Sequence, residues 1–476
     1  MSWQPNKQGK QTLQQQIIAW VVEHIERGDW GAGTKLPTQR ALAMQFGVNR
    51  STIQQAMEEL KSMGLLEARV GAGVYVAPKS WHALLQRTQP NWQHSIETSL
   101  HKPNDYTIQL INDYEQRDDM IRLGTGELAP SLLPTAEIEA SLQQITLQPK
   151  VLGYSSPQGS LALRQAICAY VKKRGIHAQP ENICIVSGAL QALQLIAMGT
   201  LEQGAIVFHE KSSYLHSIQP FQSIGMQMVA VQRTSELATT LAQQKRKRQA
   251  IFYAIPTLHN PTGAVWTMAE KKQVYEACQQ SRIPIIEDDV YHELLFAGDS
   301  TPIKAMDVSG QVLYIGSVSK TLSPGLRIGW IIGPTTVITR LADIKMQTDY
   351  GSSAISQEIV RYWLQSGKYE QHLMNLRQQL QQRAIYVESL LQAKFHSIAS
   401  WQSSKGGFYI WLKFHQPIVR KPLFMALLQH NVLLNPGYIY QPQDMHHIRL
   451  SYAYATYDEL QKGLQILYDC VTAHNF

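Results

Sequence analysis

One lysine of the chain, Lys320, has hydroxyl-bearing residues and an arginine close to it in sequence. The segment covers residues 317–329 and reads Ser-Val-Ser-Lys-Thr-Leu-Ser-Pro-Gly-Leu-Arg-Ile-Gly. A lysine amine forms a Schiff base with an aldehyde, and a phosphate group on the same molecule requires hydroxyl donors and a cation nearby. Ser317 and Ser319 would supply the hydroxyls, and Arg327 would supply the cation. The segment therefore predicts covalent binding of a phosphorylated aldehyde.

Three acidic residues directly follow an apolar run, residues 283–286. We expect the run to be a strand and the carboxylates to lie at its carboxyl end, where open α/β sheets bind ligands. If the aldehyde belongs to a pyridine ring, a carboxylate that faces the ring nitrogen keeps it protonated. We assign this role to Asp288, although Asp289 has the same chemistry. Tyr291 follows closely enough to approach the phenolic oxygen of the ring.

A short turn between a predicted strand and a predicted helix is a second candidate for binding the phosphate. The backbone amides at the start of a helix point outward and carry positive partial charge, which suits a phosphate group. The predicted contacts in this turn are Ser187, Gly188, Ala189 and Leu190.

Single residues elsewhere could complete the site. Asn260, in an Asn-Pro-Thr-Gly turn, could donate to the phenolic oxygen, and Tyr214 could stack on the ring. Arg449 follows the start of a late predicted strand and could bind a carboxylate through two parallel hydrogen bonds. Gly126 could offer its amide to the same carboxylate, with a plain turn glycine as the alternative.

The elements that must position these residues alternate between short apolar runs and helical patterns from about Ile121 onward. The predicted strands are residues 183–186, 205–208, 228–231, 251–255, 283–286, 312–315 and 329–332. Strands that alternate with helices predict an α/β fold with a mainly parallel sheet that helices cover on both faces. From about Ser353, a long helical pattern and two further strands predict a smaller α+β lobe.

The first 77 residues carry the patterns of three helices and a hairpin. Apolar residues recur at four-residue steps from Leu13 to Ile25, which predicts the first helix. Thr38 can cap a second helix that Gly47 ends, and Asn49 can cap a third. Two helices joined by a tight glycine turn form a helix-turn-helix, and the hairpin that follows would be its wing.

In a helix-turn-helix the start of the second helix reaches base edges and phosphates in the major groove. Arg50 could bind a guanine edge or clamp a phosphate, and the sequence leaves both open. Glycine in the wing lets the tip approach the sugar-phosphate backbone closely. The predicted DNA contacts are Arg40, Asn49, Arg50, Ser51, Thr52, Gln54 and Gly71.

These motifs resemble two known families. The run from Gly33 to Gly73 is similar to the N-terminal domain of the GntR family of bacterial regulators, although Gln39 stands where many relatives carry Glu. The second resemblance, across residues 121–476, is to the fold-type I, class I and II aminotransferases. It is carried in order by Tyr154, Ser187, Gly188, Ala189, Tyr214, Asn260, Asp288, Tyr291, Lys320, Arg327 and Arg449.

The combination is similar to the MocR subfamily of GntR regulators, which implies pyridoxal 5'-phosphate as the cofactor and double-stranded operator DNA as a partner. In the aminotransferase family the residue that matches Tyr154 reaches the phosphate of the neighbouring subunit, so the resemblance implies a head-to-tail homodimer. One departure concerns Asp288 and Tyr291, which lie three residues apart here, whereas many MocR proteins have a spacing of two.

Length and composition agree with this organisation. With 476 residues the chain favours several domains, and we expect a DNA-binding domain at 1–77, a linker at 78–120 and a cofactor-binding domain at 121–476. Four cysteines without CxxC spacing predict neither a zinc site nor disulfides, so no metal is expected. We find no signal peptide pattern and no apolar stretch that could span a bilayer, and therefore expect a cytoplasmic protein without membrane contact.

Two functions remain open. In the first, the aminotransferase-like domain senses pyridoxal phosphate, or an amino acid or amine that forms an aldimine with it at Lys320, and thereby modulates operator binding. In the second, the protein is an active aminotransferase with an appended DNA-binding domain. The basic run at residues 245–248 is a solvated face or a contact with flanking DNA. The sequence names neither the effector nor the operator.

Overall fold

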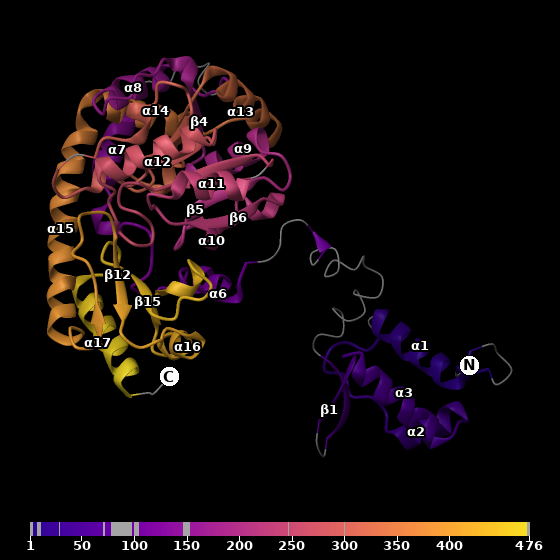
Figure 1. Ribbon diagram of the computed structural model, residues 1–476. Coiled ribbons are helices and arrows are strands. Elements are labelled where there is room, and N and C mark those ends of the chain that lie inside the picture. The colour runs from indigo at the N-terminus through magenta and orange to yellow at the C-terminus, as the bar shows by residue number, and fades with distance from the viewer. Residues whose placement is uncertain are drawn as a thin grey trace. The chain divides into compact units, whose positions relative to one another are not determined.

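The structure is a computed structural model that describes residues 3–6, 11–27, 29–69, 72–77, 98–99, 104–145, 153–245, 247–298 and 300–473. The chain divides into two units, Met1–Lys102 and Pro103–Phe476 (Figure 1). No described helix is long and apolar enough to cross a membrane.

The first unit contains the predicted three helices and hairpin. Its elements are α1 (Leu13–Glu26), α2 (Gln39–Phe46), α3 (Arg50–Ser62), β1 (Leu66–Arg69) and β2 (Gly73–Val76). Thr38 Oγ1 accepts a hydrogen bond of 3.2 Å from Ala41 N at the start of α2, and Gly47 ends this helix with φ of 61°. Asn49 occupies the cap position of α3, but its side chain makes no capping hydrogen bond. The winged helix-turn-helix fold is confirmed.

A single apolar core holds the first unit together. The stripe of α1 contributes Ile17, Val21 and Ile25, and all three side chains are fully buried. Leu42 and Phe46 of α2 pack into the same core. Burial of one such side chain stabilises a domain by roughly 1.5–3 kcal/mol, so the periodic residues of the three helices account for their mutual packing.

The second unit is built on a seven-stranded sheet with the order β4-β10-β9-β8-β7-β5-β6. Its strands are β4 (Ile183–Val186), β5 (Ile206–Glu210), β6 (Gln227–Val231), β7 (Ala250–Ala254), β8 (Ile285–Asp288), β9 (Val312–Ser317) and β10 (Gly329–Ile332). All neighbouring pairs are parallel except those of β10, which runs antiparallel to β4 and β9. The predicted mainly parallel sheet is therefore confirmed.

The helices of this unit cover the large sheet, and the last two along the chain belong to the smaller lobe (Figure 1). These helices are α7 (Thr135–Gln144), α8 (Leu161–Lys172), α9 (Ala189–Thr200), α10 (Leu215–Ile218), α11 (Leu237–Lys245), α12 (Met268–Gln280), α13 (Thr335–Thr348), α14 (Ala354–Ser366), α15 (Lys368–Lys394), α16 (Lys421–Gln429) and α17 (Tyr457–Ala473). The long α15 runs along one side of the unit from the large sheet to the smaller lobe (Figure 1). Its buried residues contribute to two separate apolar clusters of this unit.

The smaller lobe contains a four-stranded antiparallel sheet with the order β11-β12-β15-β14. Its strands are β11 (Ala399–Ser400), β12 (Tyr409–Phe414), β14 (Asn435–Pro436) and β15 (His447–Ser451). A separate pair joins β13 (Val432–Leu433) to β3 (Ile121–Arg122) in parallel, so the start of this domain is tied to its end.

One helix of the second unit, α6 (Tyr106–Tyr114), lies within the stretch expected to be a linker, residues 78–120. Asp105 Oδ1 caps α6 by accepting a hydrogen bond of 2.8 Å from Thr107 N. Ile108 and Ile111 pack against the small-lobe residues Phe424 and Tyr440. Residues 104–120 thus form part of the folded unit, because their apolar face is covered. Most of the preceding stretch lies outside the described residues.

Candidate functional site

A cavity of about 380 Å³ opens at the carboxyl ends of the parallel strands and is closed by the smaller lobe and α6. Open α/β sheets bind ligands in this place. Most of the candidate residues line it, although they come from distant parts of the chain. These are Gly126, Ala189, Leu190, Tyr214, Asn260, Asp288, Tyr291, Ser317, Ser319, Lys320, Arg327 and Arg449.

Lys320 projects its amine into this cavity. Its Nζ donates a hydrogen bond of 2.6 Å to Gly126 O. The ring of Tyr291 lies 5.9 Å from the same nitrogen, measured to the ring centroid. The amine is thus held by one carbonyl and an aromatic face, with no carboxylate of the described residues in an ion pair with it.

Asp288 has one carboxylate oxygen without a partner. The Tyr253 hydroxyl donates a hydrogen bond of 2.8 Å to Asp288 Oδ2, whereas Oδ1 is buried and has no hydrogen-bond partner among the described residues. Burial raises the pKa of this carboxyl to about 6. A protonated pyridine nitrogen would satisfy the buried oxygen and stabilise its charge. The unpartnered acceptor at this position therefore fits the protonated ring nitrogen of pyridoxal phosphate.

The neighbouring Asp289 is turned away from the cavity. It forms an ion pair of 2.8 Å with Arg174 and accepts a hydrogen bond from Tyr314. The expectation that all three carboxylates follow the strand is wrong, because β8 extends to Asp288 and includes Glu287. A carboxylate can occupy this buried strand position because the backbone amides of residues 303 and 304 donate to Glu287 at 2.7 and 2.8 Å.

Arg327 and the turn before α9 form a cradle suited to an anion. Arg327 Nη2 donates to Ser187 O at 2.7 Å. Gly188 has φ of +89°, and a Cβ at this position would lie 2.6 Å from Arg327 Nη2. Ser187 and Gly188 do not line the cavity themselves, and α9 begins at Ala189 directly beside it. Glycine is thus required for the close approach of the arginine to the helix start.

The two serines of the lysine segment complete this cradle. Ser317 Oγ lies 3.0 Å from Ser319 Oγ and 2.9 Å from Ile328 O. Both serines line the cavity together with Arg327. Two hydroxyls, a guanidinium and a helix start are the groups that bind phosphate monoesters in proteins.

Arg449 also lines the cavity and is buried. Nη1 donates to Asn260 Oδ1 at 2.9 Å, and Nη2 donates to Gly124 O at 2.6 Å. The guanidinium carbon lies 4.1 Å from the ring centroid of Tyr409 and 5.1 Å from that of Tyr440. Its buried Nε has no hydrogen-bond partner among the described residues. An unsatisfied donor of this kind is suited to an incoming carboxylate.

Three tyrosines and a glutamate at the site were not predicted. The Tyr409 and Tyr291 hydroxyls lie 3.0 Å apart, and Tyr253 supports Asp288. Tyr440 and Glu115 line the cavity wall. The sequence offered one signal for Tyr409, which lies in a largely apolar run late in the chain; the structure shows that this run is β12 and pairs with the strand of Arg449. Glu115 offered none, because it follows α6 in the expected linker.

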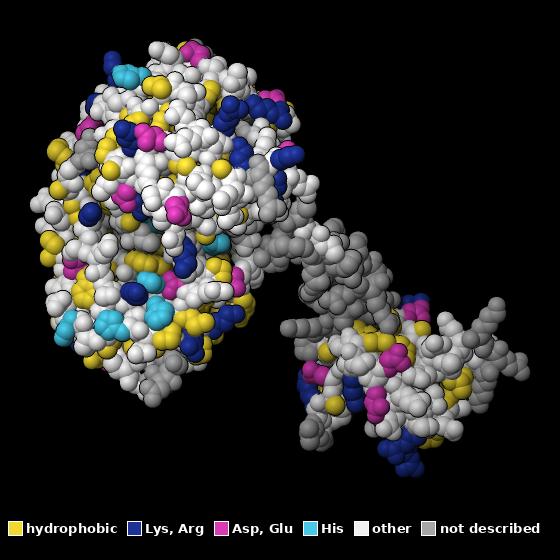
Figure 2. Space-filling model, viewed as in Figure 1, with side chains coloured by type: hydrophobic (Ala, Val, Ile, Leu, Met, Phe, Trp, Pro, Cys, Tyr) yellow, Lys and Arg dark blue, Asp and Glu magenta, His cyan; other side chains and the backbone are white. Residues whose placement is uncertain are grey.

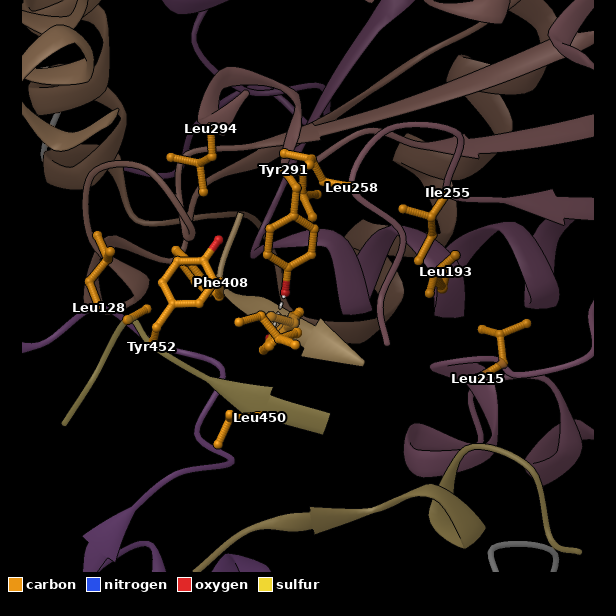
Figure 3. Packing of buried hydrophobic residues seen from close by; sticks show 14 of the residues in the cluster. Leu128, Leu193, Leu215, Ile255, Leu258, Tyr291, Leu294, Phe408, Leu450 and Tyr452 are labelled. Atoms are coloured by element: carbon orange, nitrogen blue, oxygen red, sulfur yellow. Dashed lines mark hydrogen bonds between the residues drawn. The ribbon is translucent and has the colours of Figure 1, made fainter. Parts of the chain in front are cut away.

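Tyr291 itself is embedded in the apolar core that supports the cavity. Its ring meets Phe408 edge to face with 5.6 Å between centroids (Figure 3). Leu258 and Leu294 belong to the same buried cluster and are labelled in the same view (Figure 3). Tyr214 is half-buried at the cavity, and desolvation raises its pKa to about 12; burial also raises the pKa of Tyr291, so both phenols remain protonated near neutral pH.

Tyr154, a further candidate of the cofactor group, lines a different recess from the one that holds Lys320. Its side chain is 85% exposed and packs against Tyr350, with 5.3 Å between ring centroids. Both rings line a separate shallow recess of about 300 Å³.

The candidate DNA contacts lie on the surface of the first unit. Arg40 and Arg50 are exposed and form no ion pair with a carboxylate of the described residues. Acidic and basic side chains are interspersed on the visible face of this unit (Figure 2). Gln54 Nε2 donates to Glu58 at 3.1 Å. Asn49 and Ser51 are also exposed, Thr52 is half-buried, and Gly71 lies outside the described residues.

The basic run at residues 245–248 is partly engaged within its own domain. Lys245 Nζ donates to Ser281 O and Arg282 O at 3.0 and 3.2 Å. Arg248 Nη1 donates to Gln227 at 2.6 Å, and residue 246 lies outside the described residues.

A seven-stranded sheet of this order, with a lysine, an aspartate and an anion cradle at one cavity, defines a pyridoxal-phosphate-dependent aminotransferase fold of type I. A model of the family "Aminotransferase class I and II" matches residues 118–467. A model of the family "Bacterial regulatory proteins, gntR family" matches residues 13–76. The chain belongs to the MocR subfamily of GntR-type transcription regulators, which joins these two domains, and its cofactor is pyridoxal 5'-phosphate.

Relatives of similar length share both domains. The HTH-type transcriptional regulator YisV of Bacillus subtilis, itself uncharacterized, is 44% identical over 467 residues, which cover 97% of this chain and 96% of the relative. The HTH-type transcriptional regulator NorG of Staphylococcus aureus is 35% identical over 442 residues, or 92% of this chain and 99% of the relative. These similarities confirm the predicted class of DNA-binding regulator.

Solved structures show the fold of the second domain. A kynurenine aminotransferase of Pyrococcus horikoshii, solved in complex with PMP, has a TM-score of 0.74 and 26% identity, covering 82% of this chain and 98% of its own. The α-aminoadipate aminotransferase LysN of Thermus thermophilus has a TM-score of 0.70 and 24% identity, with 82% and 98% coverage.

Proposed function

We propose that this regulator senses pyridoxal phosphate, or an amino acid or amine that reacts with it, and that occupation of the cavity changes its affinity for operator DNA. One observation carries the proposal: Lys320, Asp288 and Arg449 line one cavity in a chain that also carries a winged helix-turn-helix. A ligand shifts such an equilibrium only if it binds two conformations with different affinity.

In this proposal, the side chains of the cavity bind different groups of the cofactor. Arg327, Ser317 and Ser319 bind the phosphate group. Asp288 holds the proton of the ring nitrogen, and Lys320 is the amine that binds the carbonyl carbon. When bound, the cofactor supplies an electrophilic carbonyl that primary amines attack.

The remaining ligand groups would face the small lobe. Arg449 binds the carboxylate of the amino compound through its unpartnered Nε. Asn260 and Tyr291 reach the phenolic oxygen of the ring, and Tyr214 stacks on it. Gly126 lies beside Lys320 and takes part through its backbone.

A head-to-tail homodimer is part of this proposal. The exposed Tyr154 lies outside the cavity of its own chain, which supports a role at the phosphate of a neighbouring subunit. In the first domain, Arg40 and Arg50 would contact DNA, with the start of α3 in the major groove. Binding to a chromosomal operator would place the protein in the cytoplasm.

Replacement of the lysine tests the proposal directly. Purified protein supplemented with pyridoxal phosphate should show a visible absorbance band that Lys320→Ala abolishes, and the cofactor should change operator affinity only in the wild type. Lys272→Ala, an exposed lysine on α12, is the matched control and should behave as the wild type. A wild-type operator affinity that responds to neither cofactor nor any amino compound would overturn the sensing function.

The second candidate function is an active aminotransferase with an appended DNA-binding domain. It is favoured by the completeness of the site, since the lysine, the aspartate and the carboxylate-binding arginine are all in place. Steady turnover of amino donors with 2-oxoglutarate at roughly 1 per second or faster would support it, because enzymes commonly reach such rates. Turnover orders of magnitude slower would leave sensing as the function.

A further inference from the structure

The cavity contains charged groups that the proposed function leaves unused. That function gives a role to the lysine, the aspartate and both arginines of the cavity wall. It gives none to two glutamates, Glu115 and Glu127, which also line the cavity. Glu115 is half-buried, and burial raises its pKa. A desolvated carboxylate is costly unless donors or a cation stabilise it, so its presence in the wall requires a physical reason.

Among the residues that the structure describes, one donor contacts Glu115. The Thr125 hydroxyl donates a hydrogen bond of 3.0 Å to Glu115 Oε1. Arg122 and Arg449 lower its pKa through their charge, but neither forms an ion pair with it, and the nearby Glu127 raises it. The carboxylate also lies at the carboxyl end of α6, where the partial negative charge of the helix adds to its own. This corner of the cavity therefore favours a positively charged ligand group.

The short segment 124–126 contacts Glu115 through Thr125, and it also contacts the two side chains expected to bind an amino compound. On one side of residue 125, Gly124 O accepts from Arg449 at 2.6 Å. On the other side, Gly126 O accepts from Lys320 at 2.6 Å. Consecutive Cα atoms lie about 3.8 Å apart, so the three residues that contact the charged side chains span about 8 Å along the backbone. One small ligand can reach all three.

Apolar side chains line the same cavity as these charges. Ile108 and Ile111 of α6 line the cavity together with Ile218. Aliphatic groups of a ligand gain about 0.8 kcal/mol per buried methylene against such a wall. The cavity thus combines a carboxylate-binding arginine, an amine-reactive position, an aliphatic wall and a second carboxylate.

We propose that Glu115 makes the regulator selective for α-amino acids whose aliphatic side chain ends in an ammonium or guanidinium group. The inference rests on the proposed function, in which Arg449 binds the α-carboxylate and Lys320 marks the position of the α-amine. Glu115 accepts hydrogen bonds from the terminal cation, and Glu127 adds negative charge beside it. Glu115 is a specificity-determining residue and takes no part in bond formation.

The experiment compares two ligands of similar length that differ in terminal charge. The full-length protein, loaded with pyridoxal phosphate, is titrated with L-lysine and with L-norleucine, and the change in visible absorbance gives each dissociation constant. The wild type should bind lysine at least about tenfold more tightly, because a hydrogen bond to a charged group contributes about 1.5–3 kcal/mol. Glu115→Gln should lose this preference while its affinity for norleucine stays within about twofold.

Asp113→Asn is the matched control, since Asp113 lies on the same helix but is exposed and outside the cavity. It should retain the wild-type preference. An unchanged cofactor band in every variant verifies folding and loading.

The other outcomes overturn the inference in distinguishable ways. Equal affinity of the wild type for lysine and norleucine would remove the charge selectivity and leave the sensing function intact. Weaker binding of both ligands in Glu115→Gln would show that Glu115 only positions Arg449. A spectrum that no amino acid changes would overturn both this inference and the sensing of amino compounds.

Discussion

Arg449 Nη1 donates a hydrogen bond of 2.9 Å to Asn260 Oδ1, across a sequence separation of 189 residues. Arg449 lies on β15 of the small lobe, whereas Asn260 follows β7 of the large sheet. Because a guanidinium can only donate, the amide oxygen of Asn260 must face it. The amide nitrogen then points away from Arg449 and is available to donate to the phenolic oxygen of the cofactor. One contact thus orients both Asn260 and Arg449, the residues that we propose for the cofactor and for the effector.

Arg449→Lys should weaken binding of amino acids by roughly 10–100-fold and leave cofactor binding nearly unchanged. Lysine keeps the positive charge but loses the planar fork that binds a carboxylate and an amide together. Titration of the loaded protein, followed by visible absorbance, measures the effect. Arg340→Lys, exposed on α13, should match the wild type. Wild-type affinity in Arg449→Lys would exclude this arginine from the effector site.

Asp288→Asn should remove a pH-dependent part of the stability of the cofactor-free protein. Burial raises the pKa of Asp288 from its usual 3.8 to about 6. The folded state therefore holds this proton more tightly than the unfolded chain. The contribution is fully present below about pH 3.8 and is lost as the pH rises through about 6.

The shift corresponds to about 3 kcal/mol. Denaturant unfolding of both proteins between about pH 4 and pH 7 measures it. The free energy of unfolding of the wild type, relative to that of Asp288→Asn, should fall by this order across the range. A difference independent of pH would show that the Asp288 pKa is not raised in the folded protein.

Gly188→Ala should reduce cofactor affinity at least about tenfold and lower the free energy of unfolding by about 1–3 kcal/mol. The position has φ of +89°, and the new Cβ would lie 2.6 Å from Arg327 Nη2, so the guanidinium must leave the cradle. Gly204→Ala separates the two effects, because Gly204 also has a positive φ of +82° but has open space around it. It should lose stability alone. Similar cofactor affinity in both variants would contradict the proposed cradle.

Arg50→Ala should weaken binding to DNA from the upstream intergenic region. If Arg50 contacts a phosphate, affinity falls for all sequences and the slope of log K against log salt decreases by about one. If it binds a guanine edge, discrimination at one base pair falls instead, by about 1–3 kcal/mol. Arg27→Ala is the control, because Arg27 is an exposed residue that follows α1 and forms an ion pair with Glu23. Unchanged affinity at matched salt would exclude Arg50 from the interface.

Local patterns were sufficient to predict most of the fold. The seven apolar runs overlap β4 to β10, because buried parallel strands require continuous apolar residues. Thr38 and Gly47 marked the ends of α2 through their cap preferences. The prediction failed at β8, where Glu287 is a buried strand residue, since amides from a distant turn stabilise its carboxylate. No local pattern encodes such long-range partners.

The sequence by itself determined which residue types stand together for cofactor and DNA binding, because caps, turns and periodic faces are short-range properties of the chain. Only the tertiary structure decided which of two adjacent aspartates faces the cavity. It also brought Glu115, from the expected linker, beside Arg449 and Lys320. The physical reason is that pairing of β12 with β15 and packing of α6 on the small lobe depend on contacts between distant residues. These contacts select one arrangement among many that the local patterns permit.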